Sequence, residues 1–233
     1  MLGIFYYPWY GGPNNPEVKW RHWKNGGHNP PETWNARYLP YVFELTSTTT
    51  DPSIRLYDSF DQEVVKRQMS LIRNAHINFV IWSWWGKESF SDHAFSKFWN
   101  SGNSNNPLGL MHCVYYEKEW LNNVPYEEIK SDIDYIKSKY ATDSKYLKIN
   151  SSPVLFVYNS TPLQYRTDST YQVKLSDKWN EIRQETNVYT VLKVFRNWRL
   201  QKQGEFLASI CAQYSLFYVY RILFLYKPRM VES

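Results

Sequence analysis

Short apolar segments alternate with amphipathic segments along most of the chain. The apolar segments are rich in aromatic and β-branched residues, which fit the pleated surface of a strand. One of them, FVIWSWWG, is almost continuously apolar, as expected for a strand buried on both faces of a parallel sheet. The pattern therefore predicts strands at residues 2–7, 79–86, 110–116, 154–158 and 189–195.

Helical periodicity fills the intervals between these segments. It predicts helices at residues 59–75, 92–100, 125–140 and 177–184. Ser59 and Gln62 have the spacing of a capping box at the start of the first helix. Pro125 opens the third helix, which has glutamates in its first turn and lysines in its last, as the helix dipole favours. The regular alternation of strands and helices is that of βα units.

Five clear βα units predict an α/β fold of the (β/α)8 TIM-barrel type, and five units do not close an eight-stranded barrel. The length of 233 residues is close to the roughly 250 residues of such a barrel. From Arg196 the alternation stops, and residues 216–226 form an aromatic, apolar run. We expect residues 1–195 to be the N-terminal part of a barrel and residues 196–233 to be an atypical tail, which is truncated or frame-shifted.

The aromatic share of 18%, with 11 Trp and 20 Tyr, is the unusual feature of the composition. Aromatic faces stack on the C–H faces of sugar rings, so such side chains are typical of carbohydrate sites. Large aromatic cores produce the same composition, and composition alone leaves both explanations open.

The net charge of +5 is dispersed, without the basic run that marks a nucleic-acid site. Cys113 and Cys211 lie far apart, and the five His lack a metal-binding spacing, so we expect no metal site and a buried, free Cys113 thiol. No apolar run reaches the length of a membrane span. Because no signal peptide precedes the first strand, the expected localisation is cytoplasmic by default.

Aromatic residues gather where the first two predicted strands end. In (β/α) barrels, active sites are built at the carboxyl ends of the strands. A core role is the alternative, and we expect it for Phe5 and for one of Tyr6 and Tyr7. The repetition at two strand ends favours a binding surface. The candidates at these ends are Trp9, Tyr10, Trp84 and Trp85.

Two polar residues add candidate chemistry. His22 lies between Trp20 and Trp23, where it is either a partner for sugar hydroxyls or a residue that caps a turn. Glu117 follows the third strand, and a carboxylate at the exit of a barrel strand is a candidate for acid/base work. Exposed loop glutamates are also ordinary, so the pattern leaves a surface role open.

An ordered series of motifs resembles the glycoside hydrolase family 99-like group, which includes endo-α-mannosidases. The series spans Gly3 to Phe195 and consists of GIFYYPWYGG, WRHW, QMSLIRNAHINFVIWSWWG, CVYYEKEW, PVLFVYN and VLKVF. The resemblance implies a (β/α)8 barrel that cleaves an α-linked, mannose-containing glycan with retention, without metal or organic cofactor. It implies a sugar cleft at the carboxyl ends of the strands, lined by Tyr7, Trp9, His22, Trp84, Trp85 and Tyr158.

The sequence departs from this group in two places. The endo-mannosidases carry a His-Ile-Glu-Pro-Tyr type motif on the third strand, where this chain has HCVYYE, with the acid displaced to Glu117. The group's catalytic carboxylate pair lies on a late strand, and residues 196–233 offer no such pair.

Three functional interpretations follow from these observations. The first is a glycoside hydrolase-like protein that acts on or binds α-linked, mannose-containing glycans. The second is a catalytically inactive carbohydrate-binding barrel. The third is a scaffold barrel whose aromatic residues form only core. The expected partner under the first two is an oligosaccharide, and the oligomeric state is left open.

Overall fold

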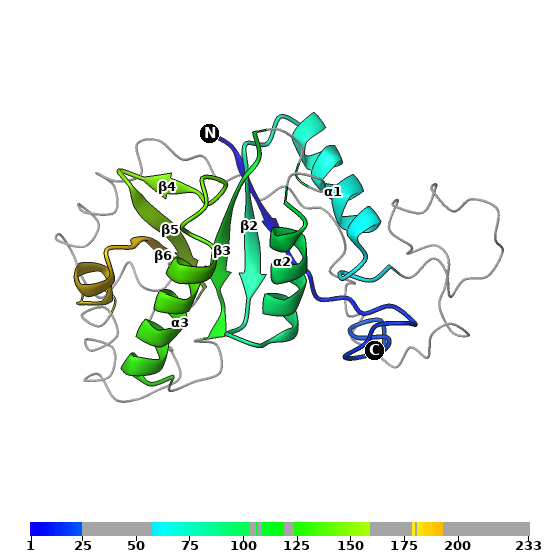
Figure 1. The fold of residues 1–233 in the computed structure, drawn as a ribbon, viewed down its shortest axis with the longest axis horizontal. Coiled ribbons are helices and arrows are strands. Elements are labelled where there is room, and N and C mark those ends of the chain that lie inside the picture. Colours follow the sequence, from blue (N-terminus) through cyan, green and yellow to red (C-terminus); the bar gives the residue numbers. More distant parts are fainter. Residues whose placement is uncertain are drawn as a thin grey trace, which may run out of the picture. The chain divides into compact units, whose positions relative to one another are not determined.

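The computed structural model describes residues 1–24, 57–102, 106, 109–118, 124–158, 179 and 181–192 (Figure 1). Its elements in chain order are β1 (Gly3–Tyr6), α1 (Gln62–Asn74), β2 (Phe79–Trp84), α2 (Phe90–Asn100), β3 (Met111–Tyr116), α3 (Tyr126–Lys139), β4 (Lys148–Ile149), β5 (Ser152–Val157) and β6 (Tyr189–Leu192).

The described residues divide into two compact units. The first, which we call the sheet unit, contains residues 1–6, residues 77–89 and the described residues from 110 onwards. It therefore holds every strand and α3. The second, which we call the helix-pair unit, contains residues 7–24, 57–76 and 90–102, and it holds α1 and α2.

The strands of the sheet unit form one largely parallel sheet. β1 pairs with β2, β2 with β3, β3 with β5 and β5 with β6, all in parallel, and the arrowheads of β1, β2 and β3 point the same way in Figure 1. β4 makes a short antiparallel hairpin with β5, through a two-residue turn in which Asn150 and Ser151 have positive φ. The strand order follows the chain without reversal, as in a barrel, whereas a doubly wound sheet reverses its order.

Alternation along the strands sorts their side chains onto two faces. On the face toward α3, the ring of Trp84 lies 6.3 Å from that of Tyr135, and the Tyr116 hydroxyl donates to Asp132 at 3.0 Å. We call this the α3 face. The other side, which we call the far face, carries Phe5, Ile81, Ser83, Cys113, Tyr115 and Phe156, as the strand register requires.

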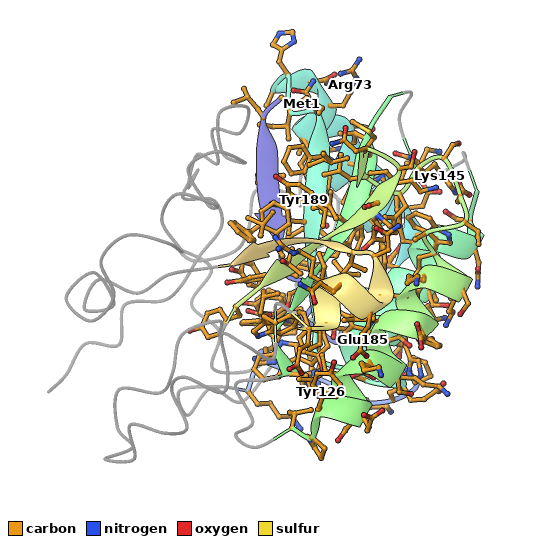
Figure 2. The ribbon with its side chains drawn as sticks, turned by 90° about the vertical axis from the view of Figure 1, so that its left-hand side faces the viewer. Met1, Arg73, Tyr126, Lys145, Glu185 and Tyr189 are labelled. Atoms are coloured by element: carbon orange, nitrogen blue, oxygen red, sulfur yellow. The ribbon has the colours of Figure 1, made fainter. Side chains whose placement is uncertain are left out.

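α3 covers one side of the sheet, as both views show (Figures 1 and 2). Its buried apolar residues are Ile129, Ile133 and Ile136, and burying such side chains is worth roughly 1.5–3 kcal/mol each. Along its flank, Lys130 pairs with Glu185 at 2.7 Å, and Lys137 donates to the carbonyl of Thr186 at 2.8 Å. These contacts attach the helical residues 181–186 to α3.

The helix-pair unit has its own small core. Phe60 precedes α1, and its ring stacks on that of Phe90 at the start of α2, with centroids 4.6 Å apart. Ala94 completes this buried cluster. The guanidinium of Arg21 lies over the Phe90 ring, 4.7 Å from its centre. The segment after β1 is thereby packed against α2 within this unit.

The first helix begins differently from the prediction. The N-cap of α1 is Asp61, whose carboxylate accepts from the backbone N–H groups of Glu63 and Val64. The predicted capping box from Ser59 is therefore wrong. The Ser59 hydroxyl instead accepts from the backbone N–H of Tyr10 at 3.1 Å, a contact 49 residues away that no local pattern contains.

The predicted strands at residues 2–7, 79–86, 110–116 and 154–158 and the predicted helices at 92–100 and 125–140 are confirmed to within two residues at each end. The predicted helix at 177–184 and strand at 189–195 are described only in part, with helical residues at 179 and 181–186 and a strand at Tyr189–Leu192. Cys113 is a buried free thiol, as predicted. In the part of the chain that the structure describes, no helix is long and apolar enough to cross a bilayer. The predicted tail at residues 196–233 lies outside the described residues.

A buried histidine on β3 makes folding sensitive to acid. The indole N–H of Trp82 donates to Nδ1 of His112 at 3.1 Å, and His112 is fully buried. An indole N–H only donates, so Nδ1 accepts and the imidazole is neutral. Burial, and then the charge of Lys145, lower the pKa of His112 to about 3.

We predict that the free energy of unfolding decreases as the pH is lowered, because of this histidine. The folded-state pKa lies below the ordinary value of 6.5, so the unfolded chain binds the extra proton first. The contribution of neutral His112 to the free energy of unfolding is fully present above pH 6.5 and is lost as the pH falls from 6.5 towards 3. Urea unfolding at pH 7 and pH 5 should show the parent losing about 2 kcal/mol more than His112→Gln, which keeps an acceptor without titrating there. Equal losses in both proteins would contradict the assignment.

Candidate functional site

The ladder of the sheet continues past the formal ends of two strands. The backbone N–H of Glu117 donates to the carbonyl of Trp84 at 2.9 Å, and that of Tyr158 donates to the carbonyl of Tyr116 at 3.0 Å. Both residues are thus held in strand-like geometry at the carboxyl edge of the sheet. The alternation that places Tyr115 and Phe156 on the far face places Glu117 and Tyr158 there too.

Glu117 is a buried carboxylate on this face, with a side chain from the neighbouring strand bonded to it. Only 4% of Glu117 is exposed, so it is not the ordinary surface glutamate that the sequence left open. The hydroxyl of Ser83, which is itself fully buried on β2, donates to Oε2 of Glu117. A hydrogen bond to a charged group is worth roughly 1.5–3 kcal/mol, which helps to offset the burial of the carboxylate.

Aromatic rings lie on the same face of the sheet as the carboxylate. The ring of Tyr158 lies 5.8 Å from that of Tyr115, and the ring of Tyr115 lies 4.8 Å from that of Phe5 on β1. Burial raises the pKa of Tyr158, and the charge of Glu117 raises it further, so the phenol stays protonated and can donate. The far face at the carboxyl edge therefore combines an acidic group, a phenol hydroxyl and apolar ring faces.

Lys118 anchors the end of β3 on the α3 face. Its ammonium group pairs with Glu128 at 2.6 Å and with Asp132 at 2.8 Å, both on α3. Burial alone would lower the pKa of Lys118, and the hydrogen bonds to Asp132 and Glu128 outweigh it and raise the pKa. Glu117 and Lys118 are consecutive in the chain. The ion pairs of Lys118 on the α3 face therefore hold the backbone in the position that directs the Glu117 side chain to the far face.

Gly86 allows the Lys118 side chain to reach α3. Its φ of +111° is a conformation that side chains rarely adopt, and a Cβ placed there would lie 2.9 Å from Cδ of Lys118. A side chain at this position, which directly follows Trp84 and Trp85, would therefore clash with Lys118.

The two tryptophans at this strand end differ in their surroundings. Trp84 is fully buried on the α3 face, with its ring 5.7 Å from that of Tyr116. Trp84 therefore packs the sheet against α3. Its role in sugar binding stays a prediction. Trp85 follows β2 and is half-buried.

In the helix-pair unit, the aromatic residues after β1 gather around His22. The His22 ring stacks on Trp9, with centroids 5.4 Å apart and planes 25° apart, and Tyr10 lies 6.0 Å away. Tyr7 packs edge-on against Trp9 and is 41% exposed, so this cluster presents aromatic surface to solvent. The structure brings together these four predicted site residues: Tyr7, Trp9, Tyr10 and His22.

Asp58 holds the loop that carries this cluster. Its carboxylate accepts from the backbone N–H of Gly12 at 3.1 Å and from the side-chain amide of Asn15 at 2.8 Å. The Asn15 carbonyl in turn accepts from Glu17 N–H and Val18 N–H. The loop is therefore held by a set of partly buried hydrogen bonds.

His22 carries two marks of a constrained position. Its φ of +59° costs roughly 1–2 kcal/mol for a residue other than glycine, and such strain clusters at binding and catalytic sites. Burial, and then the charge of Arg21, lower the pKa of His22, so the ring is neutral near pH 7. A neutral imidazole has one donor and one acceptor, as a sugar hydroxyl does.

Sequence reasoning missed Ser83 and the Lys118 anchor. Ser83 had a signal, because it is the one polar residue within the apolar segment at 79–86. Lys118 had none beyond its position next to Glu117. Among the described residues, no group of three His, Cys, Asp or Glu is placed to hold a metal ion.

A sheet wound in one direction, with a buried carboxylate and aromatic rings at the carboxyl ends of its strands, is the arrangement of (β/α)-barrel enzymes. The family model of glycosyl hydrolase family 99 matches residues 1–187. The chain therefore belongs to glycosyl hydrolase family 99, whose members act on glycans.

Two curated relatives agree with this assignment. The chain is 24% identical over 186 residues to a glycoprotein endo-alpha-1,2-mannosidase of Mus musculus, and 25% identical over 188 residues to a glycoprotein endo-alpha-1,2-mannosidase-like protein of Danio rerio. The matches cover 69% and 68% of this chain. They cover 37% and 38% of the relatives, so the chain spans less than two fifths of their length.

Solved structures show the same fold. A GH99 endo-alpha-mannosidase from Bacteroides thetaiotaomicron superposes with a TM-score of 0.58 at 16% identity, over 85% of this chain and 56% of that one. A second structure of a GH99 endo-alpha-mannosidase from that genus, in complex with bis-tris propane, gives a TM-score of 0.51 at 19% identity, over 68% and 42%. The predicted α/β fold of the barrel type is confirmed, and the described strands form one part of such a barrel.

We predict that Gly86→Ala destabilises the chain more than Gly102→Ala. Both glycines have positive φ, and a Cβ at Gly102 meets no atom within 4 Å. Gly102→Ala should therefore cost about 1 kcal/mol for its backbone conformation alone. Gly86→Ala adds the contact with Lys118 and a φ of +111°, which lies outside the left-handed region of Gly102, so it should cost about 2–3 kcal/mol in urea unfolding.

Lys118→Ala provides the control for this comparison. In that background the added contact is gone, so the cost of Gly86→Ala should fall to the part that its φ of +111° imposes. An unchanged cost would show that Lys118 does not constrain residue 86.

Proposed function

We propose that this chain binds α-linked, mannose-containing glycans at the carboxyl edge of its sheet and acts on them with Glu117 as an acid/base group. The observation that carries the proposal is the pairing of a buried carboxylate with Tyr158 and Tyr115 on the far face. The family supports a glycan as ligand, and the names of the two curated relatives support mannose as its sugar.

The chemistry of the far face suits a sugar. A pyranose has apolar C–H faces, which stack on aromatic rings, and hydroxyls, which need donors and acceptors. Half-buried Phe5 supplies ring surface, with buried Tyr115 packed behind it. Half-buried Tyr158 supplies a phenol donor, and the Glu117 carboxylate accepts. We propose that half-buried Trp85, at the end of β2, adds to this surface.

The helix-pair unit by itself offers a second set of suitable groups. Trp9 presents a ring stacked on a neutral His22, with Tyr7 and Tyr10 beside it. We propose that these residues also contact glycan. The stacking of the His22 ring on Trp9 and its neutral state near pH 7 support a binding role, because a stacked, neutral imidazole can exchange hydrogen bonds with sugar hydroxyls.

Cleavage needs more than the described strands supply. Retaining glycosidases use two carboxyl groups, about 5–5.5 Å apart in the usual case. Within the strands that the structure describes there is no Asp or Glu, and Glu117 directly follows one of them. Hydrolysis by that mechanism therefore requires a second carboxylate from outside these strands, whereas glycan binding does not.

We predict that Tyr158→Phe weakens the binding of an α-linked mannotriose about tenfold, as expected for one lost hydrogen bond to the sugar. Tyr135→Phe is the matched control, because it removes the same hydroxyl from α3 on the other side of the sheet. Isothermal titration of both variants measures the difference. Equal affinity in the two variants would argue against a site on the far face.

Glu117→Gln then separates cleavage from binding. A variant that binds the trisaccharide and has lost all hydrolysis supports the acid/base role. If Glu117→Gln hydrolyses the trisaccharide at the rate of the parent, Glu117 is not the acid/base group. If the parent binds without hydrolysis, the chain is a binding barrel.

A further inference from the structure

Ser83 is out of place in its strand. β2 reads FVIWSW, and every residue of it is buried. Ser83 lies on the far face, beside Tyr115 in the register with β3, and none of its surface is exposed. A hydroxyl buried among apolar residues is costly without a hydrogen-bond partner. Its hydroxyl donates to the carboxylate of Glu117.

The bond joins two strands at a defined position. Ser83 and Tyr115 are register partners, as are Trp84 and Tyr116, so Glu117 projects one step beyond the last pair. The backbone bond from Glu117 to Trp84 keeps the chain in the ladder at that step. Glu117 therefore reaches back diagonally to Ser83 across the same face, at a separation that long side chains can span.

We propose that Ser83 is a positioning residue that holds the Glu117 carboxylate ionised and directed along the far face. This inference rests on the proposed function, in which Glu117 contacts the glycan. A hydroxyl donor stabilises the charged carboxylate over the neutral acid and restricts its rotamers. The Lys118 anchor acts on the same residue from the α3 face, through the backbone.

A purely structural serine makes a different prediction. Serine also occurs in strands where a neighbouring strand leaves room only for a small side chain. In that case the hydroxyl is incidental, and its removal would leave the ionisation of Glu117 unchanged. The pKa of the Glu117 carboxyl therefore separates the two roles, because a packing role does not move it.

The test is a carbon-13 NMR titration of the 233-residue chain labelled at the glutamate side-chain carboxyl. The Glu117 resonance is the one that disappears in Glu117→Gln. Ser83→Ala should raise the measured pKa of this carboxyl by about 1–2 units, a ten- to hundredfold change in its ionisation constant. Ser138→Ala is the control, since its hydroxyl donates to the carbonyl of Tyr135 within α3. Ser83→Cys, with a weak donor of similar size, should give an intermediate value.

A Glu117 pKa that stays within 0.3 units, roughly the precision of such a titration, in both Ser83→Ala and Ser83→Cys would overturn the inference. Adding α-linked mannotriose to the parent tests the proposed function separately. Movement of the Glu117 resonance supports glycan contact. A Glu117 resonance that does not change contradicts that contact. The pKa change in Ser83→Ala would still show that Ser83 positions the Glu117 carboxylate.

Discussion

The parallel register of β2, β3 and β5 is the constraint on which the rest of the site depends. Register decides which side chains share a face, and a slip of one residue would exchange the two faces. With the observed register, Glu117 lies on the far face beside Ser83, while Lys118 turns to α3. Backbone bonds beyond the strand ends extend that order to Glu117 and Tyr158. The carboxylate is therefore placed by the ladder and not by a loop.

The two faces of the sheet have different roles: the α3 face packs against the helix, and the far face carries the carboxylate. On the α3 face, Trp84 and Tyr116 pack beneath the helix, and Asp132 joins Tyr116 to Lys118. This packing is stabilising and keeps the strand ends in register. On the far face, the same strands hold a carboxylate that burial penalises. Such a group persists because the packed face supports it, and strained or costly groups are typical of functional sites.

Much of the fold could be predicted from the sequence, because each strand is a separate apolar run and each helix has its own periodicity. Local patterns also placed aromatic residues at strand ends. They failed where contacts are long-range: Ser59 bonds to Tyr10 rather than capping α1, and Ser83 meets Glu117 only through strand pairing. Trp84 and Trp85 looked equivalent in the sequence. Adjacent residues point to opposite faces of a strand, and only the register shows that Trp84 faces α3.

The most direct test of this account is amide NMR of the 233-residue chain, recorded with and without α-linked mannotriose. The central claim is that the carboxyl edge of the sheet is where a glycan binds. It predicts that amide shifts change at residues 83–86, at Glu117 and Lys118, and at Tyr158. Changes confined to α3 and residues 181–186, with the strand ends unmoved, would contradict it.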